Sequence, residues 1–277
     1  MSLSINLNSA AMSATRYLTA NNNALGKSIE RLSSGYRVNN ASDDPAGLVI
    51  SQKLRAQIGG LAQAITNSND AINMVKTAEG ALNETHSLLL SMRDLAVHAA
   101  NVGTNDDASL AADQSQITSA IAAIDRISTN TQFGDTVLLD GTAGAAGDGV
   151  LDFQVGAYAG QTAQVTLESV AALDLSVNLI DVTTDAQAAL TAIDAAITQV
   201  STMRADLGAF QKNVLESNVN SLSIAKENIA ASESSIRDTD MAAEMVNFTK
   251  SQILQQAGIS MLAQANQAPQ SLLKLLQ

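Results

Sequence analysis

The sequence predicts a mainly α-helical protein: a long helical rod with a coiled coil between its N- and C-terminal segments, plus a small β-hairpin region. Apolar residues at both ends of the chain recur every three or four positions, which is the period of one face of a helix. A second run of this kind continues without proline up to about Asn101. Between residues 136 and 180 the pattern changes to the alternation that indicates β-strands.

The N-terminal segment is the first predicted helix. Its apolar residues form a narrow seam of the kind that packs in coiled coils, namely Ala11, Ala14, Leu18, Leu25 and Leu32. We expect this helix to end at Gly35, because glycine readily adopts the left-handed conformation that follows many helix C-termini.

The second predicted helix begins at Pro45, which suits the first turn of a helix. Asp43 and Asp44 precede it and can accept hydrogen bonds from its free N–H groups. The helix extends over some 55 residues, which span roughly 80 Å at 1.5 Å per residue. Its apolar face is predicted to contain Leu54, Ile58, Leu61, Ile65, Ile72, Val75, Leu82 and Leu89. This length predicts a rod.

Two further helices and the hairpins complete the middle of the chain. Asp106 and its neighbours can cap a helix that ends near residues 130–134, and Asp185 can cap another. In that last helix a seven-residue repeat is formed by Leu215, Leu222, Ile229 and Ile236. Between these helices, alternating apolar residues and turn glycines predict β-hairpins over residues 136–180.

The C-terminal stretch matches the N-terminal one in its low charge. Residues 241–277 hold only Glu244, Lys250 and Lys274, and residues 1–29 hold only Arg16 and Lys27. The packing residues predicted here are Ile253, Ala257, Met261, Leu262, Leu272 and Leu273. Because the termini of a soluble monomer usually fray, these apolar ends predict a protein that completes its fold by assembling. We expect residues 1–40 with 237–277 to form a terminal coiled-coil domain, and residues 41–236 a helical domain carrying the hairpins.

The negative charge is concentrated in the middle of the sequence. Residues 101–199 contain 13 acidic residues and one basic residue, and the rest of the chain is neutral, for a net charge of −12. This distribution predicts an acidic, solvated exterior and neutral ends that pack without mutual repulsion. It argues against nucleic acid as a partner, because phosphate binding requires clustered Lys and Arg.

The sequence predicts neither catalysis nor a metal or cofactor site. The chain has no cysteine, and His86 and His98 are its only imidazoles. We expect His86 at the boundary of the apolar seam and His98 at the surface. No glycine-rich stretch is followed by the Lys-Ser/Thr of a phosphate-binding loop. Asp238, Asp240 and Glu244 lack the turn glycine of an EF-hand, so we interpret them as the cap of a helix junction.

A membrane span is not predicted either. Residues 251–273 carry no charge, but they contain six glutamines and Pro269. These residues are unfavourable in the bilayer core.

Both ends of the sequence resemble the signatures of bacterial flagellins. The N-terminal signature is the run RLSSGYRVN at Arg31–Asn39, followed by Asp43-Asp44 and Ala46-Gly47-Leu48. The C-terminal signature consists of QILQQA at residues 252–257 and MLAQAN at residues 261–266. The run Phe153-Gln154-Val155-Gly156 is similar to the family's hairpin motif. The resemblance covers nearly the whole chain.

The resemblance implies a structural subunit that self-assembles into the helical flagellar filament, which drives swimming motility. It implies export through the flagellar type III channel, an extracellular location, an inner tube of terminal helices and an outer tube formed by residues 41–236. Since residues 140–184 leave room only for hairpins, it implies a short form without large outer surface domains. The implied partners are other copies of the chain, the export apparatus, an export chaperone, the filament cap and the hook-junction proteins.

One helical segment has a further implied role. Some relatives use the region matching Leu89, Arg93, Leu95 and Val97 for recognition by an innate receptor, or for axial packing between subunits. Ser91 stands where stimulatory relatives carry arginine.

Two alternative functions remain open at this point. The hook–filament junction protein has similar ends and forms a short adaptor ring, although the intact C-terminal runs favour flagellin. A soluble helical binding module is the other alternative. Such a module is expected to be monomeric or dimeric, with termini that resist proteolysis.

Overall fold

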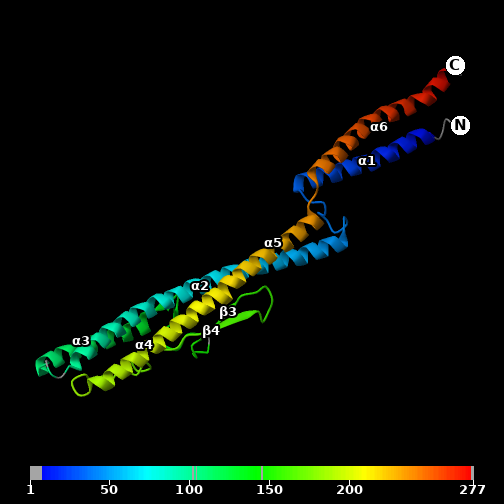
Figure 1. Cartoon of the computed structure of the whole chain (residues 1–277). Coiled ribbons are helices and arrows are strands. Elements are labelled where there is room, and N and C mark those ends of the chain that lie inside the picture. The colour runs from blue at the N-terminus through cyan, green and yellow to red at the C-terminus, as the bar shows by residue number, and fades with distance from the viewer. Residues whose placement is uncertain (1–7, 102, 104, 145, 276–277) are drawn as a thin grey trace. The chain divides into compact units, whose positions relative to one another are not determined.

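A computed structural model describes residues 8–101, 103, 105–144 and 146–275, with side chains described as far as Gln267. The order of elements (Figure 1) is α1 (Ser9–Ser34), α2 (Pro45–Ala99), α3 (Asp107–Asn130), β1 (Gln132–Phe133), β2 (Thr136–Val137), β3 (Val150–Gln154), β4 (Thr162–Thr166), α4 (Ala186–Ala209), the π-helix η1 (Phe210–Glu216), α5 (Ser217–Arg237) and α6 (Met241–Leu275). The mainly α fold with a small β region is confirmed.

The described chain forms two compact units. One, the terminal unit, comprises the residues up to Ala56 together with those from Asn228 onward. The other, the core unit, comprises Gln57–Glu227 and contains the large hydrophobic core.

The predicted helix boundaries are confirmed by the hydrogen bonds that cap them. Gly35 has φ 76° and donates its N–H to the carbonyl of Arg31, so it closes α1 in the left-handed conformation. Pro45 is the first residue of α2, and Asp44 Oδ1 accepts from the N–H of Gly47. Asp106 and Asp185 cap α3 and α4 in the same way.

The buried face of α2 follows a regular heptad through the core unit. Its members alternate between spacings of three and four, and they are Ala64, Ser68, Ala71, Val75, Ala78, Leu82, Thr85, Leu89, Met92, Ala96 and Ala99. The hydroxyls of Ser68 and Thr85 donate to carbonyls one turn back, so these two polar residues can be buried without an unpaired donor. His86 lies half-buried beside this face, as expected for a boundary residue.

The β region is smaller than the sequence predicts. β3 and β4 form an antiparallel hairpin in which Leu151 pairs with Val165, both buried, and β1 pairs with β2. The expectation of strands continuing to residue 180 is wrong: residues 167–185 form turns and irregular backbone. Hydrogen bonds from α3 hold this segment, since Gln114 joins the backbones of Ile180 and Val182. Apolar residues alternate with polar ones in this segment because its turns direct the apolar side chains into the core.

Gly149 is expected to tolerate no side chain. It has φ 77°, and an added Cβ would lie 2.6 Å from the carbonyl oxygen of Leu167. Gly149→Ala should therefore lower the free energy of unfolding by about 3 kcal/mol. Gly147→Ala is the matched control, because Gly147 has φ 68° but open space around it, so only about 1 kcal/mol is expected. Urea unfolding measures both; equal losses would rule out the close contact as the cause.

Candidate assembly surface

The two terminal helices, α1 and α6, lie side by side in the terminal unit (Figure 1). Polar side chains join them along their length. Asn8 Nδ2 donates to the carbonyl of Ala265 at 2.8 Å, and Asn21 Nδ2 donates to that of Ser251 at 2.7 Å. Between these bonds, Leu18 packs against Gly258 so closely that a Cβ there would lie 3.2 Å from its Cδ1. Two asparagine hydrogen bonds therefore hold the two helices together, and Gly258 leaves the space in which the Leu18 side chain packs.

The predicted α1 residues lie on the half-buried side of that helix. Ala11, Ala14, Leu18, Leu25 and Leu32 are each partly covered, and none is fully buried.

The predicted α6 residues lie mostly elsewhere. Ile253 and Met261 are 60% and 65% exposed, and Ala257 is also exposed, whereas Leu262 is half-buried. The side chains of Leu272 and Leu273 lie outside those that the structure describes.

The side of α6 that is partly covered mixes small, polar and large apolar residues. Its members alternate between spacings of three and four: Phe248, Ser251, Gln255, Gly258, Leu262 and Ala265. Of the packing residues predicted from the sequence, only Leu262 belongs to this stripe, because the prediction followed the apolar residues. The signal that identifies it is the seven-residue series of Ser251, Gly258 and Ala265, since small residues let two helices approach closely.

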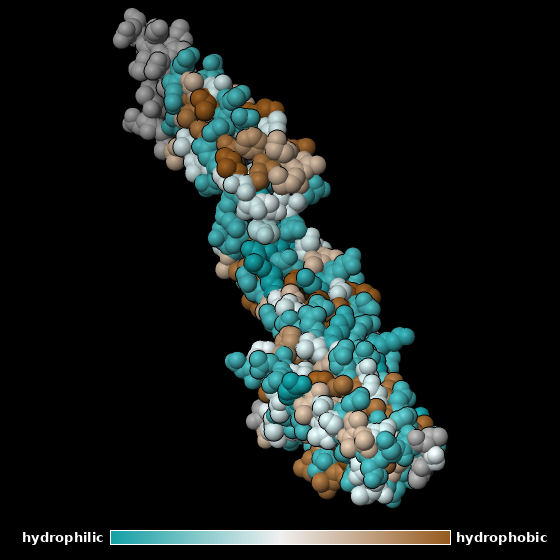
Figure 2. All heavy atoms as spheres, turned by 90° about the vertical axis from the view of Figure 1, so that its left-hand side faces the viewer, coloured by the Kyte–Doolittle hydropathy of each residue, from teal (hydrophilic) through white to brown (hydrophobic). Residues whose placement is uncertain are grey.

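Large apolar side chains are left on the outside of this helix pair. Nineteen large apolar side chains are exposed in the described chain, and ten of them belong to α1 and α6. Figure 2 shows hydrophobic atoms reaching the surface among hydrophilic ones. A shallow groove of about 640 Å³ runs between the helices, with Tyr17, Leu254 and Met261 among its walls. No described apolar side chain of either helix is fully buried, so the pair lacks a core of its own.

Several hydroxyl groups on these helices are satisfied within their own helix. Thr15 and Thr19 on α1, and Thr249 and Ser260 on α6, each donate to the carbonyl four residues earlier. A neighbouring molecule can cover such a surface without leaving these donors unpaired, which would otherwise be costly.

The linkers that join α1 to α2 and α5 to α6 are bound to each other. Tyr36 and Asp238 form an antiparallel bridge, and Arg37 N–H donates to the carbonyl of Arg237 at 2.6 Å. The guanidinium of Arg237, itself buried, lies 4.2 Å from the centre of the Tyr36 ring, a cation–π contact. Asp240 Oδ1 accepts from two backbone N–H groups at the start of α6, which confirms the predicted junction cap.

Ion pairs strengthen this junction. Lys27 Nζ lies 2.7 Å from Asp43 Oδ1, and Arg31 lies 3.6 Å from the buried carboxylate of Glu244. The hydrogen bond from Lys27 lowers the pKa of Asp43 below its ordinary value of 3.8, and the backbone N–H of Asn40 lowers it further.

The lowered pKa of Asp43 predicts a loss of stability in acid. Because the folded pKa lies below the unfolded value of 3.8, the contribution is present above that value and disappears as the pH falls through the folded pKa. Unfolding free energies of the unmodified chain and of Asp43→Asn should therefore differ at neutral pH and converge in acid. A difference that is constant with pH would contradict this assignment.

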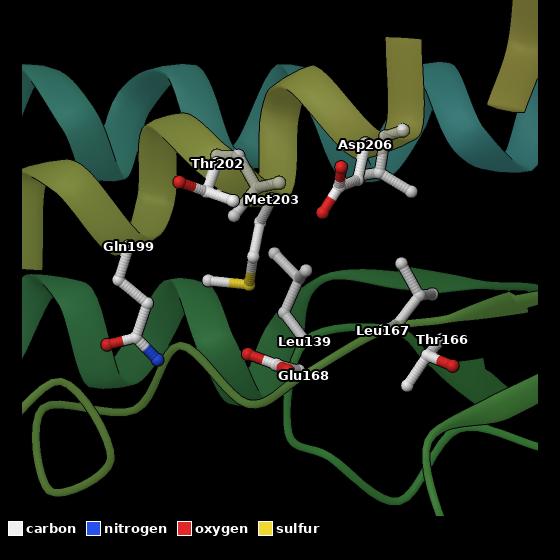
Figure 3. Close-up of a pocket in the computed structure, with 10 residues that line it drawn as sticks. Leu139, Thr166, Leu167, Glu168, Gln199, Thr202, Met203 and Asp206 are labelled. Carbon is white, nitrogen blue, oxygen red and sulfur yellow. The ribbon is translucent and has the colours of Figure 1, made fainter. Parts of the chain in front are cut away.

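The core unit contains a cleft of about 300 Å³ under the last turns of α4 (Figure 3). Met203 points into it toward Leu139, and the carboxylates of Glu168 and Asp206 lie at its exposed edge. Apart from these two carboxylates, its lining consists of four leucines, two threonines, a glutamine and Met203.

Metal and membrane sites are also lacking in the part of the chain that the structure describes. No three His, Asp or Glu side chains gather there in a way that could hold a metal ion. Nor does any described helix have the length and apolar character needed to cross a bilayer.

The segment matching residues 89–97 is only partly accessible. Leu89 is fully buried and Leu95 half-buried, whereas Val97 is 48% exposed. Arg93 Nε lies 2.7 Å from Asp194 Oδ1, so this guanidinium is paired within the chain.

Comparison with known proteins places similarity over nearly the whole chain. The bacterial flagellin N-terminal helical region matches residues 5–144, and the C-terminal helical region matches residues 190–276. Flagellin of Bacillus subtilis is 47% identical, over 98% of this chain and 99% of its own length. Flagellin of Halalkalibacterium halodurans is 46% identical with the same coverage. The crystal structure of Bacillus cereus flagellin, 28% identical, covers 57% of this chain and 88% of its own, with a TM-score of 0.50.

Proposed function

Because the chain belongs to the bacterial flagellin family, we propose that it builds the extracellular flagellar filament by packing its terminal helices against those of identical copies. The filament subunit is a structural protein of swimming motility. Full-length similarity to curated flagellins supports this function over that of a hook–filament junction protein.

The observation that carries the packing mechanism is the lack of a core between α1 and α6. Ten large apolar side chains on these helices are exposed, while the core unit buries a continuous hydrophobic cluster. Exposed apolar surface of this extent marks an interaction site. When contacts between identical subunits do not close into a ring, they produce a helical polymer.

The residues of the terminal unit then divide between two roles. Leu18 and Leu25 contribute to the pairing of α1 with α6 within one subunit. Ile253, Ala257 and Met261, which that pairing leaves exposed, pack against neighbouring subunits. We assign Leu272 and Leu273 the same intersubunit role from the sequence alone.

The distribution of charge supports an inner and an outer tube. Residues 57–227 carry 20 acidic and six basic residues, whereas the remaining residues carry seven acidic and nine basic ones. Nearly neutral terminal helices pack closely in an inner tube, and the acidic core unit faces water as an outer tube. Residues 1–40 with 237–277, and residues 41–236, are the proposed limits of these two domains.

Further partners follow from the family. They are the export apparatus, an export chaperone, the filament cap and the hook-junction proteins. The exposed part of the segment around Val97 is proposed to pack axially between subunits, because Leu89 is buried and Arg93 is paired within the chain.

Electron microscopy of the purified chain after addition of a polymerising salt tests this function. A filament subunit gives long filaments, and a junction protein gives short rings or none. Limited proteolysis of the monomer adds a second test, because a polymerising subunit should lose both ends rapidly while a binding module keeps them.

A further inference from the structure

The helix that runs from α4 into α5 contains one residue more than its buried face requires. The buried residues of α4 keep spacings of three, four or seven: Ala189, Ile193, Ala196, Val200 and Leu207. The next buried leucine, Leu215, follows Leu207 after eight positions. The π-helix η1 begins between them, at Phe210, and contains Leu215; its wider turns accommodate the additional residue. Leu207 and Leu215 are consequently both buried, at 2% and 0% exposure.

The side chains around η1 fix the place of this additional residue. If it moved past Leu215 toward the C-terminus, Val214 would replace Leu215 on the buried face. If it moved toward the N-terminus, Gly208 would replace Leu207. Both shifts expose leucine and bury a smaller residue, so the sequence specifies one position for the offset.

Contacts on each side hold the helix in this register. The ring of Phe210 lies 6.4 Å from that of Phe153 in β3, and Asn218 Nδ2 donates to the carbonyl of Val155 at 2.7 Å. Ahead of η1, Met203 reaches into the cleft beneath α4 (Figure 3). The π-helix is thus a defined part of the core unit and is anchored to the hairpin.

The outer side of η1 contributes nothing comparable to the fold. Lys212, Asn213 and Val214 are exposed, and the only side-chain hydrogen bond given by the described residues there joins Gln211 to Glu216. Without one of these residues, the two buried leucines would lie seven apart. An ordinary α-helix then satisfies the same buried face and keeps the standard hydrogen bonds.

We propose that η1 is a fixed joint whose additional residue sets the direction in which α5 continues from α4 for assembly and is dispensable for folding. π-bulges bend helices, and a small bend repeated in every copy changes the symmetry of a helical polymer. This inference rests on the proposed filament function.

The test compares three full-length variants with the unmodified chain. The first lacks Asn213; the second lacks Ser201, an exposed residue of α4 whose removal leaves Val200 and Leu207 six apart; the third is Asn213→Ala. The variant lacking Asn213 should keep a thermal unfolding midpoint at or above that of the unmodified chain. Its filaments should be lost or show a changed helical repeat in electron micrographs.

The controls separate folding from assembly. The variant lacking Ser201 should unfold at a clearly lower temperature, because its buried series is broken. Asn213→Ala should change neither the midpoint nor the repeat.

Two results overturn the proposal. One is a variant lacking Asn213 whose filaments keep the original repeat, and the other is a midpoint that falls as far as in the variant lacking Ser201. Failure of the filament function itself is distinguishable, because the unmodified chain would then give no filaments under the same conditions.

Discussion

A variant lacking residues 241–277 is expected to form no filaments at any concentration at which the complete chain polymerises. The deletion removes α6, and with it seven of the ten exposed large apolar side chains of the terminal helices. The core unit should still unfold cooperatively on heating, because its hydrophobic cluster draws on residues from Ala71 to Leu215. Electron microscopy and calorimetry measure the two expectations.

The deletion has a control that keeps the length of the chain. Gly258→Leu places a large side chain where even a Cβ would lie 3.2 Å from Leu18 Cδ1, and it should separate the helix pair without removing it. Filament formation should be weakened by this change and abolished by the deletion. Fibres growing from the deletion variant would refute the packing mechanism.

The second large effect is expected from polar substitutions at exposed apolar residues of α6. Replacing Val246, Ile253 and Met261 by Gln should raise the lowest concentration that supports filaments by about 100-fold or more. Each side chain is 60–67% exposed in the subunit, and covering such surface contributes on the order of 1 kcal/mol per residue. Three residues together then contribute about 3 kcal/mol, which corresponds to roughly a 100-fold change in equilibrium constant.

A matched variant tests whether position matters. Leu173→Gln with Leu179→Gln makes the same kind of change at side chains that are 69% and 88% exposed, but in the core unit. We expect this pair to leave the critical concentration nearly unchanged. Sedimentation of assembled protein at a series of concentrations gives both values. If both variants raised the critical concentration equally, the terminal helices would have no special role in assembly.

Much of the fold can be predicted because its signals are local. Gly35, Pro45, Asp106 and Asp185 each act within one turn of the helix that they start or end, so their residue types suffice. The heptad of α2 can also be recognised from the sequence, because it repeats over many turns of the helix.

The extent of the β region, the covered side of α6 and the π-helix depend on contacts between segments that are far apart in the sequence. The strand pattern predicts too long a β region because residues 167–185 alternate in burial without a hydrogen-bonded partner strand. On α6, the sequence pattern favours an apolar stripe facing α1, but Ile253 and Met261 of that stripe are exposed in the subunit. The π-helix is not among the predicted elements, although the eight-residue step from Leu207 to Leu215 is visible in the sequence. The roles of the packing residues in the polymer stay predictions.

The serine and threonine hydroxyls that donate to their own helices have a consequence for repeated assembly and release of a subunit. A subunit spends part of its existence dispersed in water and part enclosed among its copies. These hydroxyls donate to the same backbone carbonyls in the free subunit and in the polymer. Assembly and release of a subunit therefore break none of these hydrogen bonds. Subunits released by gentle warming should therefore be as competent to rebuild a fibre as freshly made ones.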